Sequence, residues 1–597
     1  MKVYYKFGLF LAFILVLNSC ATLKKQVKTS AEKEMPTDKE IEHSFYLIGD
    51  AGNSNLGEST KALKAFKTEL ESASKNSTAI FLGDNIYDAG LPKTTDVEYE
   101  LAKHRIKVQI DAVKKFKGKT VFIPGNHDWY SGISGLENQE KIVEKALGKD
   151  SFLPENSCPI DKIHISDDIE LIVIDTHWYI TNRNDHPTIN DDCNIKTRQG
   201  FLDEFNSLIK KARGKTTIVA LHHPMYTNGS HGGQFSFGSH MSPVPVLGTL
   251  KNIIRRTSGI ANVDIQNPLY NELKRRLVTL AQANKKVVFV SGHEHNLQYL
   301  VEDNLHQIVS GSGSKVSAVR NVGSGKFGYG TPGYAKLIVY KDGSSHVTFY
   351  SADEEKDVFQ TKVFEQNQPT KIQSQNDNLS SHTLASIYSV KETDISGFGK
   401  FLWGDRYRKD YSTKIKAPNV ILDTLFGGLT PVRKGGGNQS KSLRLKDKNG
   451  AQYVMRALRK QALQYLQAVL FKDQYIEGQF NDTATEKLVL DVFTGAHPFA
   501  PLVIGDLADA IGVYHTNPVL YYVPKQERLG QYNDEFGDEL YIIEEHTSEG
   551  HNNKASFGFQ NKLLDSDDMM KKIHMDEDII VDEAAYIRAR LFDMLIG

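Results

Sequence analysis

The stretch IFLGDNIYDAG, residues 80–90, begins as an apolar run and continues into a polar Gly-Asp-Asn segment. The same pattern recurs in SFYLIG (44–49), TVFIPG (120–125), IELIVIDT (169–176), TIVALHH (217–223) and VVFVSG (287–292). These runs are short and rich in β-branched residues, and amphipathic stretches such as residues 59–74, 98–116 and 269–284 separate them. Apolar strands that alternate with amphipathic helices predict an α/β fold whose sheet is covered on its faces.

The domain boundaries follow from where this alternation stops. The segments LQYLVED (297–303), LHQIVSG (305–311), AKLIVYKDG (335–343) and SHVTFYS (345–351) have no helical stretch between them and predict antiparallel strands. A chain of 597 residues is too long for one ordinary domain. We therefore predict a first domain over residues 44–352, a Gln-, Asn- and Ser-rich linker over 353–385, and a separate α+β region over 386–597.

The overall composition is that of a globular protein. Hydrophobic residues make up 40% and charged residues 24% of the chain, and the formal net charge is −1. A near-neutral chain argues against a nucleic-acid partner that is bound through bulk electrostatics, so we predict none.

The N-terminus has the features of an export signal. MKVYYK supplies two lysines, GLFLAFILVL is a short apolar core, and NSC ends in small residues. Leu17-Asn18-Ser19-Cys20 resembles a bacterial lipobox, which predicts a signal peptide over residues 1–20, a lipidated Cys20 and a flexible tether over 21–43. The predicted product is a membrane-anchored lipoprotein of the bacterial cell envelope, facing the periplasm or the exterior. The alternative is a plain signal peptide with an incidental cysteine.

Polar residues cluster where the predicted strands end. Five such clusters occur in order: Gly49-Asp50-Ala51-Gly52, Gly83-Asp84-Asn85-Ile86-Tyr87, Gly125-Asn126-His127-Asp128, Leu221-His222-His223-Pro224 and Gly292-His293-Glu294-His295. Open α/β sheets place their functional sites at strand carboxyl ends. Oxygen ligands combined with imidazoles suit iron, manganese or zinc, and Asp84 is the natural carboxylate to bridge two ions. A lone histidine beside a strand is more often a core residue. Five such clusters, one after another at the ends of successive strands, predict a metal site.

These clusters resemble the calcineurin-like metallophosphoesterases, and within them the purple (tartrate-resistant) acid phosphatases. The wider superfamily opens with Asp-x-His, but this chain has Asp50-Ala51-Gly52 and no histidine there. Purple acid phosphatases make the same omission and supply a tyrosinate from a Gly-Asp-x-x-Tyr motif, whose position Tyr87 occupies. GHEHNLQYL (292–300) also resembles the small, mammalian-type members. The resemblance implies a β-sandwich flanked by helices.

The resemblance also implies a dinuclear centre and a reaction. Asp50, Tyr87 and His295 would bind Fe(III); Asn126, His222 and His293 would bind Fe, Zn or Mn(II); and Asp84 would bridge the two ions. A hard trivalent cation favours an anionic phenolate and lowers the pKa of the phenol. The implied reaction is hydrolysis of phosphomonoesters by metal-bound hydroxide, with no phosphoenzyme intermediate.

Two histidines are candidates for acid–base catalysis. His127 lies in GNHD, and His231 lies nine residues after His222, a spacing that resembles the substrate-facing histidine of the family. His231 would bind phosphate or protonate the leaving alkoxide, and the alternative is an exposed loop histidine. Asp128 is expected to orient His127 or to cap a turn, and Asp175 to support the sheet. The glycine-rich residues 311–333 lack a Walker motif and predict a long turn near the site mouth.

The metal ligands alone leave the ester class open. A phosphodiesterase or nucleotide pyrophosphatase could use the same centre, and a binding protein with a vestigial phosphatase domain is the alternative from another class. The sequence also leaves open whether Cys158 and Cys193 pair.

The C-terminal region resembles a kinase-like lobe weakly. A glycine cluster precedes a predicted strand carrying Arg456, where a kinase has lysine, and no His-Arg-Asp or Asp-Phe-Gly motif occurs. The ending YIRARLFDMLIG (586–597) resembles the helix before the catalytic loop of atypical kinase-like folds, which would mean that the chain is truncated there. We interpret this region as a binding or scaffolding appendage with an unknown partner.

Overall fold

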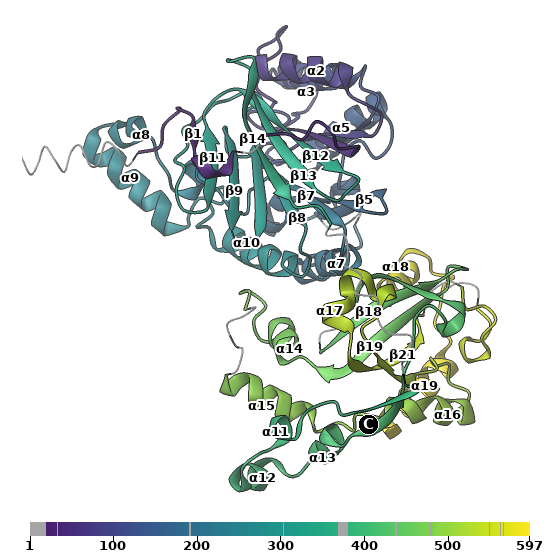
Figure 1. The fold of residues 1–597 in the computed structure, drawn as a ribbon. Helices are drawn as coiled ribbons and strands as arrows, with labels where there is room; N and C mark the ends of the chain where they lie inside the picture. Colours follow the sequence, from purple (N-terminus) through teal and green to yellow (C-terminus); the bar gives the residue numbers. More distant parts are fainter. Residues whose placement is uncertain are drawn as a thin grey trace, which may run out of the picture. The chain divides into compact units, whose positions relative to one another are not determined.

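The protein consists of two compact units, which are described separately (Figure 1). The computed structural model describes residues 20–596 except 33, 190, 192, 303, 368–379, 436–438, 477–479, 481–482, 548–549, 561–562 and 565. The first unit spans Met1–Asn367 and the second Gln368–Gly597. The predicted signal peptide, except Cys20, lies outside the described residues.

The first unit is built on two sheets. The eight-stranded sheet has the order β1-β11-β9-β10-β8-β7-β6-β5, and the six-stranded sheet has the order β14-β13-β12-β2-β3-β4. The strands of the first sheet are β1 (Gln26–Val27), β5 (Ile160–Ser166), β6 (Ile169–Ile174), β7 (Thr216–Leu221), β8 (Val287–Ser291), β9 (Leu297–Glu302), β10 (Leu305–Ser310) and β11 (Gly325–Tyr329). Those of the second are β2 (Ile41–Ile48), β3 (Ser77–Phe81), β4 (Lys119–Phe122), β12 (Gly333–Tyr340), β13 (Ser345–Ser351) and β14 (Lys356–Phe364).

Parallel pairing occupies the parts of both sheets that carry the site. β2, β3 and β4 are parallel neighbours in one sheet, and β6, β7 and β8 in the other. The later strands β9 to β14 pair with their neighbours mostly antiparallel, as their continuous run without helices predicted.

Alternate side chains of each strand face different layers, because successive Cβ atoms point to opposite faces of a sheet. Phe45 and Leu47 of β2 join one core with Val288 and Val290 of β8, so this core lies between the sheets. Tyr46 and Ile48, whose side chains point to the opposite face of β2, belong to a second core that the helices cover. Both faces of the parallel strands are therefore buried, which explains their continuous apolar sequences.

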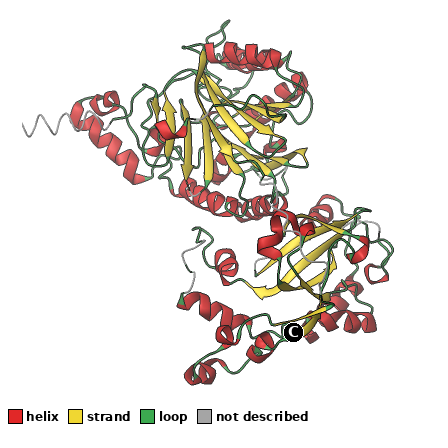
Figure 2. Cartoon of the chain, viewed as in Figure 1, coloured by secondary structure: helices red, strands yellow, loops and turns green. Residues whose placement is uncertain are grey.

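Helices cover the outer faces of the sandwich (Figure 2). They are α2 (Lys61–Ser72), α3 (Tyr99–Val113), α4 (Asn126–Trp129), α5 (Gly132–Leu147), α6 (Thr176–Ile180), α7 (Arg198–Lys211), α8 (Phe237–Met241), α9 (Pro245–Ser258) and α10 (Pro268–Ala281). Side chains of Thr60, Thr197 and Asn267 cap α2, α7 and α10 by accepting from backbone N–H groups of the first turn. The architecture confirms the predicted α/β class with a helix-flanked β-sandwich.

Two predicted boundaries are wrong. The segment predicted as a flexible tether is packed on the first unit: β1 pairs with β11, and the backbone N–H of Ala21 donates to the carbonyl of Phe235 at 3.0 Å. The predicted linker begins too early, because β14 adds an edge strand beside β13. Backbone hydrogen bonds to a neighbouring strand fix both segments, and β14 also buries Val358, Phe359, Val363 and Phe364 in the core between the sheets. The central part of the predicted linker, residues 368–379, lies outside the described residues.

The second unit contains a five-stranded antiparallel sheet of order β17-β18-β19-β21-β20 and a two-stranded sheet, β15-β16. Its strands are β15 (His382–Ala385), β16 (Ile415–Pro418), β17 (Leu429–Lys434), β18 (Ser440–Asp447), β19 (Gln452–Lys460), β20 (Val519–Val523) and β21 (Glu539–Glu545). Its helices are α11 (Val390–Thr393), α12 (Gly397–Trp403), α13 (Arg408–Ser412), α14 (Ala462–Val469), α15 (Ala484–Phe493), α16 (Pro501–Ile511), α17 (Asn533–Phe536), α18 (Ser566–Met575) and α19 (Glu583–Ile596). This agrees with the predicted separate α+β region.

The kinase-like interpretation of the second unit stays a prediction. Most of the glycine cluster lies in residues 436–438, outside the described part of the chain. Arg456, on β19, contacts the carboxylate of Glu544 on the neighbouring strand at 3.2 Å.

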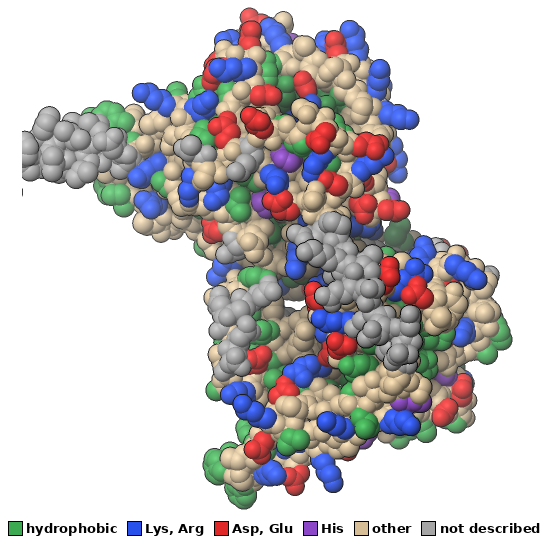
Figure 3. Space-filling view, in the orientation of Figure 1, with side chains coloured by type: hydrophobic (Ala, Val, Ile, Leu, Met, Phe, Trp, Pro, Cys, Tyr) green, Lys and Arg blue, Asp and Glu red, His purple; other side chains and the backbone are tan. Residues whose placement is uncertain are grey.

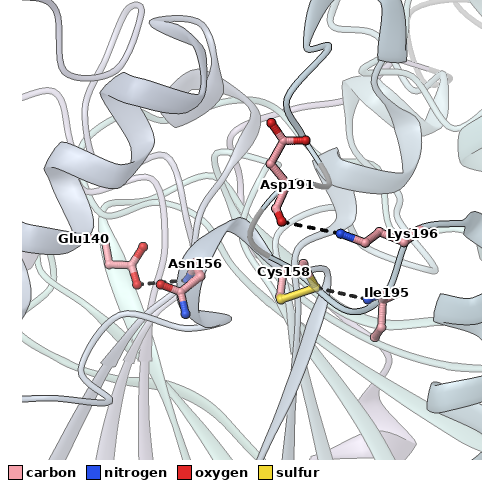
Figure 4. The surroundings of a disulfide bond; sticks show 7 residues. Glu140, Asn156, Cys158, Asp191, Ile195 and Lys196 are labelled. Carbon is pink, nitrogen blue, oxygen red and sulfur yellow. Dashed lines mark hydrogen bonds between the residues drawn. A yellow bond between two sulfur atoms is a disulfide. The ribbon is translucent and has the colours of Figure 1, made fainter. Parts of the chain in front are cut away.

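Two of the three cysteines of the first unit form a disulfide. Cys158 precedes β5 and forms a disulfide with Cys193, which lies in the loop before α7; their Cα atoms are 5.3 Å apart (Figure 4). The sulfur of Cys193 accepts from the backbone N–H of Ile195 at 3.4 Å. The bond therefore ties the long α6–α7 loop to the edge of the eight-stranded sheet.

Within the described ranges, no helix is both long enough and apolar enough to cross a membrane.

Candidate metal centre

All seven predicted metal ligands meet at one end of the sandwich. Asp50 follows β2, while Asp84 and Tyr87 follow β3, and Asn126 follows β4. From the opposite sheet, His222 follows β7, and His293 and His295 follow β8. The carboxyl ends of the parallel strands of both sheets thus converge, which is why residues 245 positions apart in sequence (50 and 295) become neighbours.

The residues predicted to bind one of the two ions lie together, and we call Asp50, Tyr87 and His295 the first ligand group. The phenol of Tyr87 donates to Oδ1 of Asp50 at 2.8 Å, and its oxygen lies 2.9 Å from Nε2 of His295. Nε2 of His295 is in turn 3.4 Å from Oδ1 of Asp50. A carboxylate oxygen, a phenol oxygen and an imidazole nitrogen therefore face a common point.

Asn126, His222 and His293 form the second ligand group. Oδ1 of Asn126 lies 3.1 Å from Nε2 of His222 and 3.1 Å from Nδ1 of His293, and the two ring nitrogens are 3.2 Å apart. The amide of Asn126 donates to the hydroxyl of Tyr130 at 2.8 Å, so its oxygen faces the imidazoles.

Backbone carbonyls fix the tautomers of both histidines in the second group. Nδ1 of His222 donates to the carbonyl of Leu82 at 2.8 Å, and Nε2 of His293 donates to the carbonyl of Val263 at 2.8 Å. When these rings are neutral, Nε2 of His222 and Nδ1 of His293 carry lone pairs that face each other and the oxygen of Asn126. Three acceptors at this separation repel one another unless a cation lies between them, so the donor set fits a metal ion.

Asp84 lies between the two groups and is buried. Its Oδ1 is 3.4 Å from Nε2 of His222, and Asp50, Asp84 and His222 form a cluster that could hold a metal ion. Burial by itself would raise the pKa of Asp84, but the adjacent His222 and His127 rings hold it well below the ordinary value. Burial would likewise lower the pKa of His222, yet the carboxylate of Asp84 raises it to about 9. The centre attracts positive charge.

The surroundings of Tyr87 disfavour ionisation of its phenol. Burial first, and then the carboxylates of Asp50 and Asp84, raise the pKa of Tyr87 well above its ordinary value. A phenolate at this position therefore requires a cation close to the oxygen, because only a nearby positive charge reverses both effects.

The backbone at the ligands is strained. Asp50, Asp84 and His293 have φ values of 55°, 53° and 71°, in the left-handed region that L side chains rarely adopt. Strained residues of this kind cluster at functional sites, where the surrounding structure holds them. Gly125 and Gly311 allow the close approach here, since a Cβ atom on either would collide with Asp84 or Glu294.

Asp128 organises two ligand loops. Its carboxylate accepts from the backbone N–H groups of Asn85, Ile86 and Gly125 at 2.8–3.2 Å. Of the two roles expected for Asp128, the structure thus shows turn capping, while Nδ1 of His127 contacts the carbonyl of Asp88. Asp175, which was expected to support the sheet, caps α6 and accepts from the indole of Trp129 at 2.8 Å.

His127 and His231 lie at the edge of the centre. The backbone N–H of His127 donates to Oδ1 of Asp84 at 2.9 Å, and its ring centroid is 4.3 Å from that of Tyr87. The ring of His231 is 4.2 Å from that of His293. Their side chains are 26% and 19% exposed, so both are reachable from solvent.

Several functional neighbours were not found from the sequence. Asp264 accepts from Nδ1 of His231 at 2.8 Å and is held by Arg255 of α9 through two contacts of 2.6 and 2.9 Å. Asp264 lies in an irregular loop with no motif, so no sequence signal marks it. Glu294 accepts from the backbone N–H of His231 at 2.9 Å, and its place between two ligand histidines was a usable signal.

The beginning of the glycine-rich segment 311–333 lies at the site, as predicted, but the segment is not one long turn, because Gly325–Tyr329 form β11. The backbone N–H of Gly313 donates to the carbonyl of Gly49 at 3.0 Å. Lys315 of this segment, also not found from the sequence, lies with its ammonium 3.4 Å from the ring centroid of Tyr87 and 3.8 Å from Asp88. The segment thus brings a positive charge to the centre.

Comparisons with known proteins agree with this geometry. The family model of the calcineurin-like phosphoesterases matches residues 43–297. Purple acid phosphatase 7 of Arabidopsis thaliana is 24% identical over 329 residues, which are 53% of this chain and 83% of that protein. Purple acid phosphatase 3 of the same plant is 24% identical over 283 residues, 46% of this chain and 63% of that protein.

Among solved structures, purple acid phosphatase PPD1 from yellow lupin (Lupinus luteus) seeds aligns over 55% of this chain and 54% of that chain, with 10% identity and a TM-score of 0.35. The family model and the two plant relatives show that residues 43–297 form a calcineurin-like phosphoesterase domain, which supports a metal-dependent phosphoric ester hydrolase.

Proposed function

We propose that the first unit hydrolyses phosphomonoesters in the manner of an acid phosphatase. The observation that carries the proposal is the pair of convergent ligand groups with Asp84 between them. Two ions held there would supply a nucleophile at neutral pH and neutralise the charge that develops on the phosphoryl group.

The chain's own residues account for the remaining steps. Asp264 holds Nδ1 of His231, which leaves Nε2 of that ring to donate a proton to the leaving oxygen of the ester. The ammonium of Lys315 and the ring of His127, both beside Tyr87, are placed to bind the non-bridging oxygens of a phosphate. A terminal phosphate offers more anionic oxygens to these groups than a diester does.

Hydrolysis rates with p-nitrophenyl phosphate and bis(p-nitrophenyl) phosphate test the ester class. We expect kcat/KM for the monoester to exceed that for the diester by at least about tenfold, the effect of one lost charged contact. A faster diester reaction would indicate a phosphodiesterase or nucleotide pyrophosphatase. No turnover of either compound by protein with bound metals would indicate a binding protein.

We propose Fe(III) for the group of Asp50, Tyr87 and His295, and Fe, Zn or Mn(II) for the group of Asn126, His222 and His293. The phenol oxygen in the first group supports this assignment, because hard trivalent cations prefer anionic oxygen ligands.

Metal analysis with a visible spectrum tests the iron assignment. The purified protein should contain iron and show a tyrosinate-to-iron charge-transfer band that disappears in Tyr87→Phe. Tyr130→Phe is the matched control, because this tyrosine touches Asn126 of the second group and its loss should leave the band in place. A colourless zinc or manganese protein with full activity would exclude iron.

We propose export and a lipid anchor at Cys20 on the basis of the N-terminal sequence. The Cys158–Cys193 disulfide supports an oxidising compartment, where such bonds persist.

A further inference from the structure

Helix α9 presents its apolar face outward. Val246, Leu247, Leu250, Ile253 and Ile254 recur at helical spacing along one side of the helix and are 48–79% exposed. Of its fourteen residues, all of them described, only Gly248 and Asn252 are buried. A helix of a globular protein ordinarily turns its apolar stripe toward the core, so this orientation is inverted.

Specific polar contacts hold α9 in this orientation. Oδ1 of Asn252 accepts from the hydroxyl of Ser239 on α8 at 2.9 Å. Arg255 forms its paired contact with Asp264, and Gly248 packs so closely on the carbonyl of His240 that no side chain fits there. Rotating the apolar residues inward would break these contacts, so the exposed face is a stable feature of the fold.

The segments at the exposed apolar face have a basic charge balance. Residues 237–263 contain Lys251, Arg255 and Arg256 and no acidic residue. Residues 20–31, which begin beside α8, contain three lysines and no acidic residue; of these, Lys25 donates to the carbonyl of Val358 on β14. Figure 3 shows hydrophobic side chains gathered over α8 and α9, with lysine and arginine side chains nearby. A second copy would bring two basic faces together, whereas an anionic lipid surface complements both the charge and the apolar stripe.

The N-terminal attachment point lies beside the same face. The backbone N–H of Ala21 donates to the carbonyl of Phe235, and Ala21 forms a β-bridge with Ser236, the N-cap of α8. Cys20 therefore leaves the first unit next to α8 and α9, which project at one edge of the sandwich (Figure 1). Acyl chains on Cys20 would enter a bilayer where the apolar face of α9 meets it.

We propose that the outer face of α9 docks on an anionic phospholipid surface, as an interfacial helix lying parallel to the membrane. Its fourteen residues give a contact about 21 Å long, and aliphatic side chains enter the acyl boundary while lysine and arginine bind headgroup phosphates. This docking goes beyond the proposed hydrolysis, because none of the five apolar residues belongs to either ligand group.

Vesicle flotation of the chain from Cys20 to Gly597 tests the docking; this chain retains every residue that the structure describes. A Cys20→Ser background removes acylation, so the contribution of α9 alone is measured. The protein should float with vesicles of phosphatidylglycerol and phosphatidylethanolamine. The triple variant Leu247→Ser, Leu250→Ser, Ile254→Ser should reduce the bound fraction by at least tenfold while hydrolysing p-nitrophenyl phosphate at the unaltered rate.

A matched control replaces equally exposed apolar residues elsewhere. Val97→Ser, Leu384→Ser, Val390→Ser removes side chains that are 94%, 66% and 72% exposed, and it should leave flotation unchanged. Lys251→Gln with Arg256→Gln should weaken binding to the anionic vesicles. Equal flotation of the two triple variants would overturn the docking. So would a dimer in light scattering that the α9 triple variant converts to a monomer, since a second copy would then be the occupant.

A labelling experiment in cells separates the acyl anchor at Cys20 from the docking of α9. It compares the incorporation of labelled fatty acid into the unaltered chain and into Cys20→Ser. Label that depends on Cys20 establishes the anchor, and flotation in the Cys20→Ser background establishes the docking. Acylation, flotation and phosphatase activity are measured separately. A failure of the proposed anchor or of the proposed hydrolysis is therefore distinguishable from a failure of the docking.

Discussion

Replacing Asp84 with asparagine should lower kcat/KM for p-nitrophenyl phosphate by more than about a hundredfold, because even residues that only support a metal ligand cost up to that much. Asp84 lies between the two ligand groups, and it is the shared carboxylate whose charge raises the pKa of His222. Asparagine keeps the size of the side chain but removes that charge. The metal content of the purified variant should fall in parallel with its activity.

Asp88→Asn is the matched control for Asp84→Asn. Asp88 lies four residues later, its side chain is 86% exposed, and its contact with His127 uses the backbone carbonyl, which the substitution retains. It should keep its metals and most of its activity. Elemental analysis and initial rates of both variants test this prediction. If Asp84→Asn bound two metal ions and kept the full rate, its carboxylate would not join the two ligand groups.

Replacing His231 with alanine should lower kcat for esters with poor leaving groups by about 10²- to 10⁴-fold, the range of general acid catalysis. The ring lies beside the second ligand group without belonging to it, and Asp264 holds its Nδ1. The loss should be smaller for p-nitrophenyl phosphate, because its leaving group departs without protonation. The variant should keep its full metal content, which separates a proton donor from a ligand.

His240→Ala is the control for His231→Ala. His240 lies on α8, and its Nδ1 contacts the hydroxyl of Thr249 at 3.3 Å. It should leave the rates with phenyl phosphate and p-nitrophenyl phosphate unaltered. An equal loss for both esters in His231→Ala would contradict the proton-donor role and would favour phosphate binding by this ring.

Local patterns were sufficient for the strands and for the polar clusters at their ends, while the resemblance to purple acid phosphatases supplied the proposed ligand set. The alternation of apolar strands and amphipathic helices predicted the α/β class, because both faces of a parallel strand are buried and the sequence must be apolar throughout. The ligands could be found one by one because each follows a strand end, and Tyr87 could be singled out because no histidine follows Asp50.

Composition was misleading at the two ends of the first unit. Residues 21–43 were predicted as a tether because they are polar and rich in lysine, yet β1 pairs with β11 through main-chain hydrogen bonds. A short edge strand such as β1 needs few apolar side chains, so its composition resembles that of a tether. The predicted linker failed for another reason: β14 pairs with β13 and buries Val358, Phe359, Val363 and Phe364, an apolar signal that the polar residues around it concealed.

Neighbours along the chain were enough to predict the parallel strands and the polar residues at their carboxyl ends, because both depend on local sequence. Contacts between segments far apart in sequence set the rest. They fix which nitrogen of His222 and His293 faces the centre, they hold His231 through Asp264 and Arg255, and they turn the apolar face of α9 outward. A periodic apolar stripe predicts an amphipathic helix equally well whether its partner is the core or a surface outside the protein.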